Sequence, residues 1–462
     1  MRTEPAEPAP ASGGEDVSAH GRATFRAAPA PVAEVEPEDA PPGKLSPNRN
    51  VLIALGAVVL LGILAIVLAM RDDPDLPATR AHRIAALYNR VTDDSVPAGA
   101  IDSIETLVGK QVRGGAFPGA AFSVGVRDRE MEETGLGRLE WGKTAPPVDP
   151  DGTMYDLASL TKVVGTTAAV MALVDDGKMG IDDHVSKYLP AFAGEGREKV
   201  TIRHLLTHTS GLSPGAKLKG SSRGERLAYY IAHAPIYTQP GKKVVYSDGG
   251  FIILAEAAER AAHEPLSRYL QHRVYAPLGM TATRWQPGAG CAACAPTLTL
   301  KDGKPFRGKT NDPISRDLGG VSGNAGLFST AHDVGRFAAM IANGGELDGV
   351  RVLKPATVAE FTHAQPKAGT RGLGWEIFCR EGTVPDAVGC KEPYAYGHTG
   401  YTGTSLWIDP VRGVWVVLLT NRTFNPTAPN PLRSLRRRIF SLAAAKEPPL
   451  PAVLADTTPD AR

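Results

Sequence analysis

The sequence predicts an α/β domain of the α+β kind: a mixed antiparallel sheet flanked by helices, with an inserted all-helical lobe, preceded by one transmembrane helix. Three observations lead to this prediction. Strand-like segments occur near both ends of the globular part, whereas its middle is helical in pattern. One uncharged apolar run is long enough to cross a bilayer. Hydrophobic residues make up 42% of the 462 residues, sufficient for a sizeable core.

Composition divides the chain into five segments. The N-terminal segment is rich in Ala, Pro, Glu and Gly, and cannot bury enough apolar surface to offset the entropy lost on ordering. From about Ala100 the composition becomes globular. We expect a disordered cytoplasmic tail at 1–49, a transmembrane helix at 50–70, a linker or stalk at 71–98, one folded domain at 99–446 and a flexible tail at 447–462.

The transmembrane prediction rests on Val51–Met70, which contains no charged residue. At 1.5 Å per residue such a helix spans about 30 Å, the thickness of a hydrocarbon core. A buried core helix or a cleaved signal peptide fits less well, because the run is long and lacks an A-x-A site before Arg71. Basic residues flank both ends, so charge alone does not fix the orientation. We expect a single-pass inner-membrane protein with its folded domain outside the cytoplasm.

Charge and cysteine content bear on the possible ligands and on the redox compartment of the protein. The net charge of +2 gives no reason to expect nucleic-acid binding. The four cysteines form two local pairs, Cys291 with Cys294 and Cys379 with Cys390. Two short-range disulfides rank first, free thiols second and a four-cysteine zinc site third, because the second pair lacks zinc-ligand spacing.

The periodicity of the sequence predicts the main elements of the folded domain. Apolar residues recur at helical spacing from Ile101 to Val112, and the segment "FPGAAFSVGVRD" after them has the pattern of a strand. A mostly apolar helix is predicted for Ser159–Asp176, and the region 180–370 is mostly helices and loops. The further predictions are strands at Phe117–Asp128, Gly135–Trp141, Tyr394–Asp409 and Val414–Asn421, and a last helix at Pro431–Ala445.

Ser159 and Lys162 form the one Ser-x-x-Lys pair of the sequence. Side chains three residues apart on a helix lie on nearly one face. A serine needs a base within hydrogen-bond reach to act as a nucleophile, and burial together with a helix N-terminus disfavours the charged form of a lysine. The same helix end directs free N–H groups at a developing oxyanion. Alone, the pattern occurs at chance frequency.

Two later stretches add candidate residues. "VVYSDGG" places Tyr246 two residues before Asp248, and "YGHTGYTG" places His398, Thr399 and Gly400 on a predicted strand. A strand edge with a small glycine lets a substrate backbone approach closely. The imidazole at its start could hold a carboxylate or relay a proton.

These three elements, in this order, resemble those of the penicillin-recognising serine hydrolases: class C β-lactamases, D,D-carboxypeptidases and related esterases. The segments "PGAAFSVGV", "LLTHTSGL", "GNAGLFSTAHDVGRF" and "LLTNR" extend the resemblance over roughly residues 100–440. It implies a β-lactamase-like domain in which Ser159 is acylated and Lys162 and Tyr246 share its activation. It also implies an oxyanion hole made by the N–H groups of Ser159 and Tyr401, with Thr399 holding a substrate carboxylate.

Two positions depart from the family's pattern. Asp248 stands where an asparagine is usual, and an ionised aspartate cannot donate a hydrogen bond to an acylamino side chain. An aspartate near Lys162 also favours the ammonium, which moves the base role toward Tyr246. His398 stands where a lysine is common, and its weaker charge implies weaker carboxylate anchoring. Both departures favour an esterase or peptidase over an efficient β-lactamase.

Other segments of the sequence match motifs of different sites. The segment Gly211–Gly215 matches G-x-S-x-G, but Pro214 follows its serine and cannot supply an oxyanion N–H. His204 and His208 have metal-ligand spacing but lack the intervening acid, so a structural role is favoured. Arg422 fits substrate binding and strand capping equally well.

The sequence therefore predicts a membrane-anchored serine hydrolase acting on esters or D-alanyl peptides, without metal or cofactor. A true β-lactamase, or a binding module that senses cell-wall fragments, is the alternative. The sequence leaves the oligomeric state open.

Overall fold

A computed structural model describes residues 96–379, 393–428 and 430–444. The predicted N-terminal tail, the apolar run Val51–Met70, nearly all of the stalk and the C-terminal tail lie outside these residues. The predicted membrane anchor therefore stays a prediction. The described part contains the elements that position the site.

The centre of the fold is a six-stranded sheet in the order β10-β11-β12-β13-β1-β2, in which every neighbouring pair is antiparallel. Two strands come from the N-terminal end of the domain and four from its C-terminal end. The prediction of one antiparallel sheet built from both ends is confirmed. The strands are β1 (Gly119–Val126), β2 (Arg129–Gly137), β10 (Glu376–Cys379), β11 (Pro393–Thr399), β12 (Ser405–Ile408) and β13 (Val414–Thr420).

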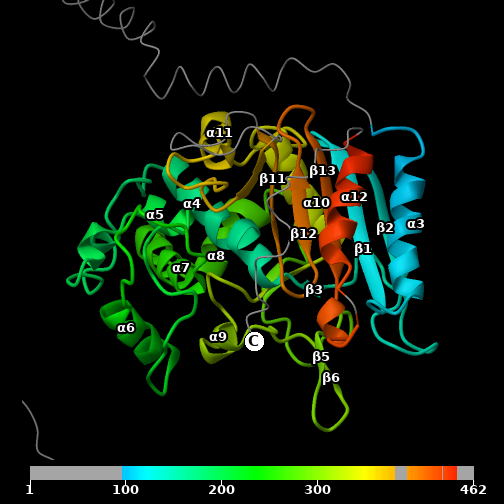
Figure 1. Cartoon of the computed structure of the whole chain (residues 1–462), viewed down its shortest axis with the longest axis horizontal. Coiled ribbons are helices and arrows are strands. Elements are labelled where there is room, and N and C mark those ends of the chain that lie inside the picture. The colour runs from blue at the N-terminus through cyan, green and yellow to red at the C-terminus, as the bar shows by residue number, and fades with distance from the viewer. Residues whose placement is uncertain (1–95, 380–392, 429, 445–462) are drawn as a thin grey trace, which may run out of the picture. The chain divides into compact units, whose positions relative to one another are not determined.

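Helices cover both faces of the sheet, so its central strands β1 and β13 are buried throughout. Helices α3 (Ala100–Arg113) and α12 (Leu432–Ala443) lie side by side on one face, although they come from opposite ends of the domain (Figure 1). Helix α10 (Ala331–Ala342) packs on the other face. Alternate residues of β13 accordingly belong to two hydrophobic cores, one on each face.

The remaining helices form the lobe that lies beside the sheet in Figure 1. Most of them are short, and 3₁₀ and π segments of three to six residues connect several of them. The helices are α4 (Ala168–Asp175), α5 (Ile202–Leu206), α6 (Arg223–His233), α7 (Asp248–Ala262), α8 (Leu266–Leu270), α9 (Pro313–Asp317) and α11 (Pro355–Thr362).

Three predictions about the elements need correction. β2 begins at Arg129, not near Gly135, because the hairpin turn at Arg127–Asp128 is shorter than expected. Strand β10 was not predicted, since its four residues give too short a pattern. Helix α10 covers a face of the sheet and is not part of the predicted helical lobe, because its apolar face packs on β1 and β13.

The predicted apolar helix at Ser159–Asp176 is present, but in three pieces. A 3₁₀ turn η1 (Ala158–Leu160) leads into a π-helical segment η2 (Lys162–Thr167) and then into α4. Among the described residues this is the one helical stretch, Ala158–Asp175, long and apolar enough to cross a membrane, and 83% of it is buried inside the protein. It is therefore a core helix of the folded domain.

Candidate active site

The strand that leads to Ser159 is held on both sides. β3 (Tyr155–Asp156) pairs with β7 (Leu327–Ser329), and the carboxylate of Asp156 accepts hydrogen bonds from Ala158 N (2.9 Å) and Asn311 N (2.6 Å). Burial raises the pKa of Asp156 to about 6, against the opposing effect of these bonds. Ala158 has a φ of 47°, in the left-handed region that side chains rarely adopt. Such strain is typical of a turn that presents a functional residue.

Lys162 lies directly behind Ser159 and is fully buried. Its Nζ donates to Ser159 Oγ (3.3 Å), to Asp248 Oδ1 (2.6 Å) and to the carbonyl of Asn324 (3.0 Å). An ammonium has three donors, and all three have acceptors here. The segment that carries the Asn324 carbonyl packs closely against α7 at Gly323. Only glycine fits there, because a Cβ at Gly323 would lie 2.2 Å from the backbone oxygen of Phe251.

The charge of Lys162 follows from this environment. Burial by itself would lower the pKa of the amine, but attraction to Tyr246 and to the Asp248 carboxylate outweighs it and raises the pKa. The structure therefore contains the ion pair that the sequence suggested. At neutral pH Lys162 is an ammonium, which cannot accept a proton from Ser159.

Tyr246 and Asp248 come from the start of α7. Ser247 caps this helix, because its side chain accepts from Gly250 N at 2.9 Å. The cap places Asp248 in the first turn, facing Lys162, and leaves Tyr246 just outside the helix. The Lys162 Nζ lies 4.8 Å from the centroid of the Tyr246 ring.

Two histidine rings flank Tyr246. The ring of His208 lies 4.5 Å from the ring of Tyr246, and its Nδ1 accepts from Ser247 N at 3.1 Å, so His208 holds the start of α7. Burial, and then the positive charges of Arg371 and Lys162, place the pKa of His208 well below its ordinary value. The Nδ1 of His204 accepts from Thr201 N at 3.2 Å at the start of α5, so each of the two histidines makes a contact of the structural kind favoured for it.

His398 is also neutral. It lies at the end of β11, is 3% exposed, and its ring is 6.2 Å from that of Tyr246. Burial, followed by the charges of Lys162 and Arg371, lowers the pKa of His398 to about 3. His398 therefore brings no positive charge to a substrate carboxylate at neutral pH. β10 pairs with β11 only as far as Gly397, so the strand edge at His398 and Thr399 extends past β10.

The turn after β11 is fastened to the strand that leads to Ser159. Thr402 Oγ1 donates to the carbonyl of Asp156 (2.6 Å), and Thr404 Oγ1 donates to that of Leu157 (2.8 Å). Gly400 permits this contact, because a Cβ there would lie 2.1 Å from Thr404 Oγ1 and 2.3 Å from Leu157 O. Neither threonine was predicted to matter, since each acts across some 250 residues of sequence.

The fastened turn brings Tyr401 to the site. The Tyr401 side chain is 71% exposed, and its backbone N–H donates to no other group of the described chain. The N–H groups of a first helical turn, such as that of Ser159 in η1, also lack intrahelical acceptors. A half-buried serine beside an ammonium, a tyrosine and unpaired N–H groups is an arrangement suited to acyl transfer.

The structure brings the three predicted elements of the site together: the Ser159 turn, the Tyr246–Asp248 helix start and the His398–Tyr401 turn. It adds Arg371, whose guanidinium carbon lies 5.7 Å from the Tyr246 ring centroid. Sequence reasoning missed Arg371, because no motif surrounds it. Arg422, a candidate for substrate binding or strand capping, donates its backbone N–H to Thr402 O (2.9 Å) and so supports the turn.

Cys291 and Cys294 form a disulfide, as the sequence favoured. Their loop lies along the strand that leads to Ser159: Met154 N donates to Ala293 O (3.0 Å), and Ala295 N donates to Met154 O (2.9 Å). The prediction for Cys379 and Cys390 falls outside the described side chains.

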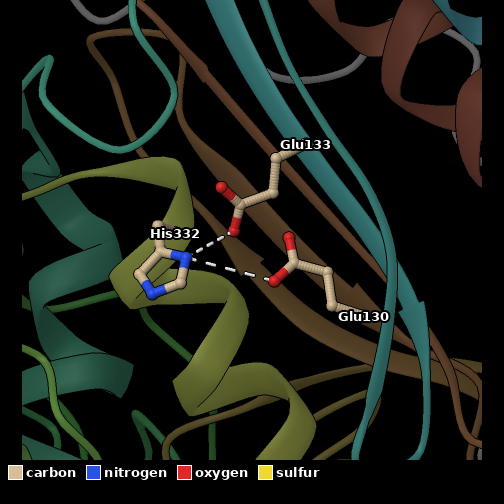
Figure 2. Close-up of side chains that lie close together, drawn as sticks. All are labelled: Glu130, Glu133 and His332. Carbon is tan, nitrogen blue, oxygen red and sulfur yellow. Dashed lines mark hydrogen bonds and ion pairs between the residues drawn. The ribbon is translucent and has the colours of Figure 1, made fainter.

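A second group of titratable residues lies on the sheet, apart from Ser159. Figure 2 shows His332 of α10 facing Glu130 and Glu133 of β2; His332 Nδ1 lies 2.7 Å from Glu133 Oε1 and 4.0 Å from Glu130 Oε2. A β-bulge explains the two glutamates, because residues three apart on a regular strand face opposite sides. The three ligand atoms lie within 4.8 Å of one another, a spacing that a divalent cation could bridge. The contacts present already form an ion pair beside a second carboxyl.

The pKa values show how this cluster holds its protons. Burial, then the neighbouring Glu133, raises the pKa of Glu130 to about 8. The hydrogen bond to Glu133 raises the pKa of His332 to about 8, against burial. Burial opposes ionisation of Glu133, but hydrogen bonds from His332 and Glu130 lower its pKa overall. At neutral pH the cluster is therefore a neutral acid, a carboxylate and an imidazolium.

This cluster predicts a pH-dependent stability. Both raised groups stabilise the fold fully below their ordinary pKa values of 4.5 and 6.5, and this contribution is lost as the pH rises through about 8. Glu130→Gln keeps a neutral donor beside Glu133, so the fall in melting temperature from pH 6.5 to 8.5 should be smaller in the variant. The difference is about 1 kcal/mol at pH 8.5, since the Glu130 side chain is 32% exposed and solvent screens part of the cost. Thermal melts measure it, with Glu105→Gln on α3 as the control; parallel curves would contradict the prediction.

Comparison with known proteins agrees with this geometry. The family model described as Beta-lactamase matches residues 104–439. A Salmonella schwarzengrund protein, named provisionally as a D-alanyl-D-alanine carboxypeptidase, is 35% identical over 307 residues, which are 60% of this chain and 71% of that protein.

Solved structures show the same fold. A beta-lactamase/D-alanine carboxypeptidase from Pseudomonas syringae superposes with a TM-score of 0.61 at 20% identity, over 74% of this chain and 99% of that one. An octameric penicillin-binding protein homologue from Pyrococcus abyssi gives a TM-score of 0.59 at 21% identity, over 75% and 78% of the two chains. At these identities the likeness concerns the fold alone.

Proposed function

The chain is a serine hydrolase of the beta-lactamase family, within the superfamily of serine β-lactamases and penicillin-binding proteins, and we propose that it cleaves acyl-D-alanyl peptides and related esters through an acyl-enzyme on Ser159. The observation that carries the proposal is the position of Ser159 Oγ, 3.3 Å from the ammonium of Lys162. Tyr246, whose ring centroid lies 4.8 Å from the Lys162 Nζ, and the free N–H of Tyr401 complete the proposed site. Each has a role in acyl transfer.

In the first step, Ser159 Oγ attacks the substrate carbonyl carbon. Tyr246, in the form that lacks its proton, accepts the Oγ proton as the Oγ–C bond forms. The Lys162 ammonium stabilises the negative charge that develops on Oγ during the transfer, and cannot itself act as the base. The N–H groups of Ser159 and Tyr401 hold the carbonyl oxygen as it becomes an oxyanion.

In the second step, the bond between the carbonyl carbon and the leaving amine or alcohol breaks. Tyr246 returns the proton to that leaving group, and the acyl chain stays on Ser159. A water molecule then gives its proton to Tyr246 and attacks the ester carbon. Collapse of the second oxyanion frees the acid and returns the proton to Ser159 Oγ, so the cycle needs no cofactor or external proton carrier.

The position of Arg371 favours a substrate that carries a free carboxylate. It is half-buried beside Tyr246 and forms no ion pair with any described residue. His398 cannot supply the missing charge, because its lowered pKa keeps it neutral. A substrate that ends in a carboxylate, such as a D-alanyl peptide, would satisfy the Arg371 guanidinium, with Thr399 at the strand edge as a second contact.

Arg371→Gln should therefore raise the KM for an acyl-D-Ala-D-Ala peptide by roughly 10- to 100-fold, the range for a hydrogen bond to a charged group. The rate on p-nitrophenyl acetate, which has no carboxylate, should change little. Steady-state kinetics on both substrates measure this difference between the effect on the peptide and the effect on the ester. Lys367→Gln, at an exposed position of the same loop, is the matched control. Equal losses on the two substrates would contradict carboxylate anchoring.

A hydrolysis panel tests the substrate class. It compares p-nitrophenyl esters, nitrocefin, acyl-D-Ala-D-Ala and D-amino-acid amide peptides. Slow turnover of nitrocefin is expected, because Asp248 cannot donate to the acylamino group as an asparagine would, and its carboxylate is engaged with Lys162. Rapid nitrocefin turnover would favour a true β-lactamase, and no turnover on the whole panel would favour a binding module.

We place this activity outside the cytoplasm, on a chain anchored through Val51–Met70. The Cys291–Cys294 disulfide supports an oxidising compartment. The proposal predicts that the protein stays in the membrane fraction after a carbonate wash. A deletion of residues 50–70 should release it into the soluble fraction.

A further inference from the structure

Arg436 of the C-terminal helix α12 contacts the turn that carries Tyr401. Its Nη2 donates to the carbonyl of Thr404 at 2.8 Å and to that of Gly400 at 3.2 Å. The Nε is buried and has no partner among the described residues. Burial lowers the pKa of Arg436 to about 10, opposed by attraction to Glu376, so the guanidinium remains a cation at neutral pH.

The contact at Gly400 involves the peptide unit that matters for catalysis. A peptide bond is a conjugated planar unit, so the carbonyl of Gly400 and the N–H of Tyr401 belong to one amide. A cation that hydrogen-bonds the oxygen draws electron density toward it and makes the N–H at the other end a stronger donor. Hydrogen bonds in such chains strengthen one another by about 10–30%.

We propose that Arg436 is a positioning residue of the oxyanion hole: by binding the Gly400 carbonyl it polarises the peptide whose Tyr401 N–H receives the oxyanion. This inference rests on the proposed function, because it assumes that acyl transfer at Ser159 uses this N–H. It assigns a catalytic purpose to a helix that lies on the face of the sheet away from α10.

Holding the turn in shape does not require Arg436. Gly400 N donates to Thr404 O (2.8 Å), and Gly403 N donates to Gly400 O (3.1 Å). The side chains of Thr402 and Thr404 fasten the same turn to Asp156 and Leu157. The geometry is thus determined by at least four other hydrogen bonds, and the particular contribution of Arg436 is its positive charge on the Gly400 oxygen.

The experiment compares Arg436→Gln and Arg436→Lys with the wild type in the full-length protein. Arg438→Ala, which removes an exposed charge from the same helix, is the matched control. The readouts are kcat and KM on p-nitrophenyl acetate and the inhibition constant of phenylboronic acid, whose tetrahedral adduct occupies the oxyanion hole. Rates are expressed per site titrated with a fluorophosphonate, so that a poorly folding variant still yields a value.

Arg436→Gln should lower kcat roughly tenfold, less than the ~10²-fold that loss of a direct oxyanion donor costs, with KM within about twofold. Phenylboronic acid affinity should fall in parallel. The kcat and boronate affinity of Arg436→Lys, which can donate to one carbonyl at a time, should lie between those of the wild type and those of Arg436→Gln. A purely structural role would reduce the number of titratable sites and leave the rate per site unchanged.

Wild-type kcat per site and wild-type boronate affinity in both Arg436 variants would overturn the inference. A failure of the proposed function gives a different result, because the wild type itself would then not be labelled at Ser159 by the fluorophosphonate.

Discussion

Replacement of Ser159 by alanine is expected to lower kcat on p-nitrophenyl acetate by at least about 10⁴-fold, since the acyl-enzyme cannot form without its hydroxyl. The fold should survive. Ser159 is only half-buried, and what its Oγ loses is one 3.3 Å contact from Lys162, whose Nζ keeps Asp248 and Asn324 as acceptors. Steady-state kinetics measure the rate, and a thermal melt checks the folding.

The matched control is Ser213→Ala. Ser213 is the serine of the G-x-S-x-G segment, and its hydroxyl donates to the backbone carbonyl of Gly215 at 2.6 Å. This variant should keep the rate of the wild type within a few-fold. Hydrolysis by Ser159→Ala at near the wild-type rate would exclude Ser159 as the nucleophile. A comparable loss in Ser213→Ala would mean that the loss is not specific to Ser159, and would also contradict the assignment.

Tyr246→Phe should give the second-largest loss, about 10²- to 10⁴-fold in kcat, the usual contribution of a general base. The reason is the charge state of Lys162. Its raised pKa keeps it an ammonium, so removal of the Tyr246 oxygen leaves Ser159 without a proton acceptor. The ring remains, and with it the packing against His208 and the Lys162 ammonium. Burst-phase kinetics resolve acylation and deacylation, and both should be slowed, because Tyr246 accepts a proton in each step.

Tyr237→Phe is the control for this variant, because Tyr237 is 70% exposed. Its rates should match those of the wild type. A Tyr246→Phe enzyme with normal acylation would transfer the base role to Lys162. In that case Lys162 would have to lose its proton, while paired with Asp248, before it could accept one from Ser159. Its raised pKa opposes that loss.

Much of the fold is predictable because its signals are local. Strand β1 is a short, mostly apolar run, helix α3 repeats its apolar residues at helical spacing, and both lie as predicted. The shared sheet followed from where such segments stand in the chain. Strand β10 was not predictable, because four residues carry too little pattern to distinguish a strand from a loop. The packing partner of α10 depends on contacts far apart in sequence, which no local period encodes.

The site shows the same division. Ser159, Lys162, Tyr246 and Asp248 could be chosen because family motifs mark them, and the charge of Asp248 already suggested an ion pair with Lys162. The depth of burial around His398 could not be read from "GHTG", and it is burial that makes this histidine neutral. Arg371 and Arg436 stand in no motif, and only the folded chain shows that they lie near Tyr246 and the Tyr401 turn. Thr402 lies within "YGHTGYTG", but its hydrogen bond to the Asp156 carbonyl joins residues 246 positions apart.

Mass spectrometry after fluorophosphonate treatment tests the central claim, an acyl-enzyme on Ser159, most directly. The account predicts one adduct per chain in the intact protein, located by peptide mapping on Ser159, and its absence from Ser159→Ala. The same peptide should carry an acyl group when the enzyme is quenched in acid during turnover of an ester. A label on another serine, or turnover of ester without any covalent intermediate on Ser159, would contradict it.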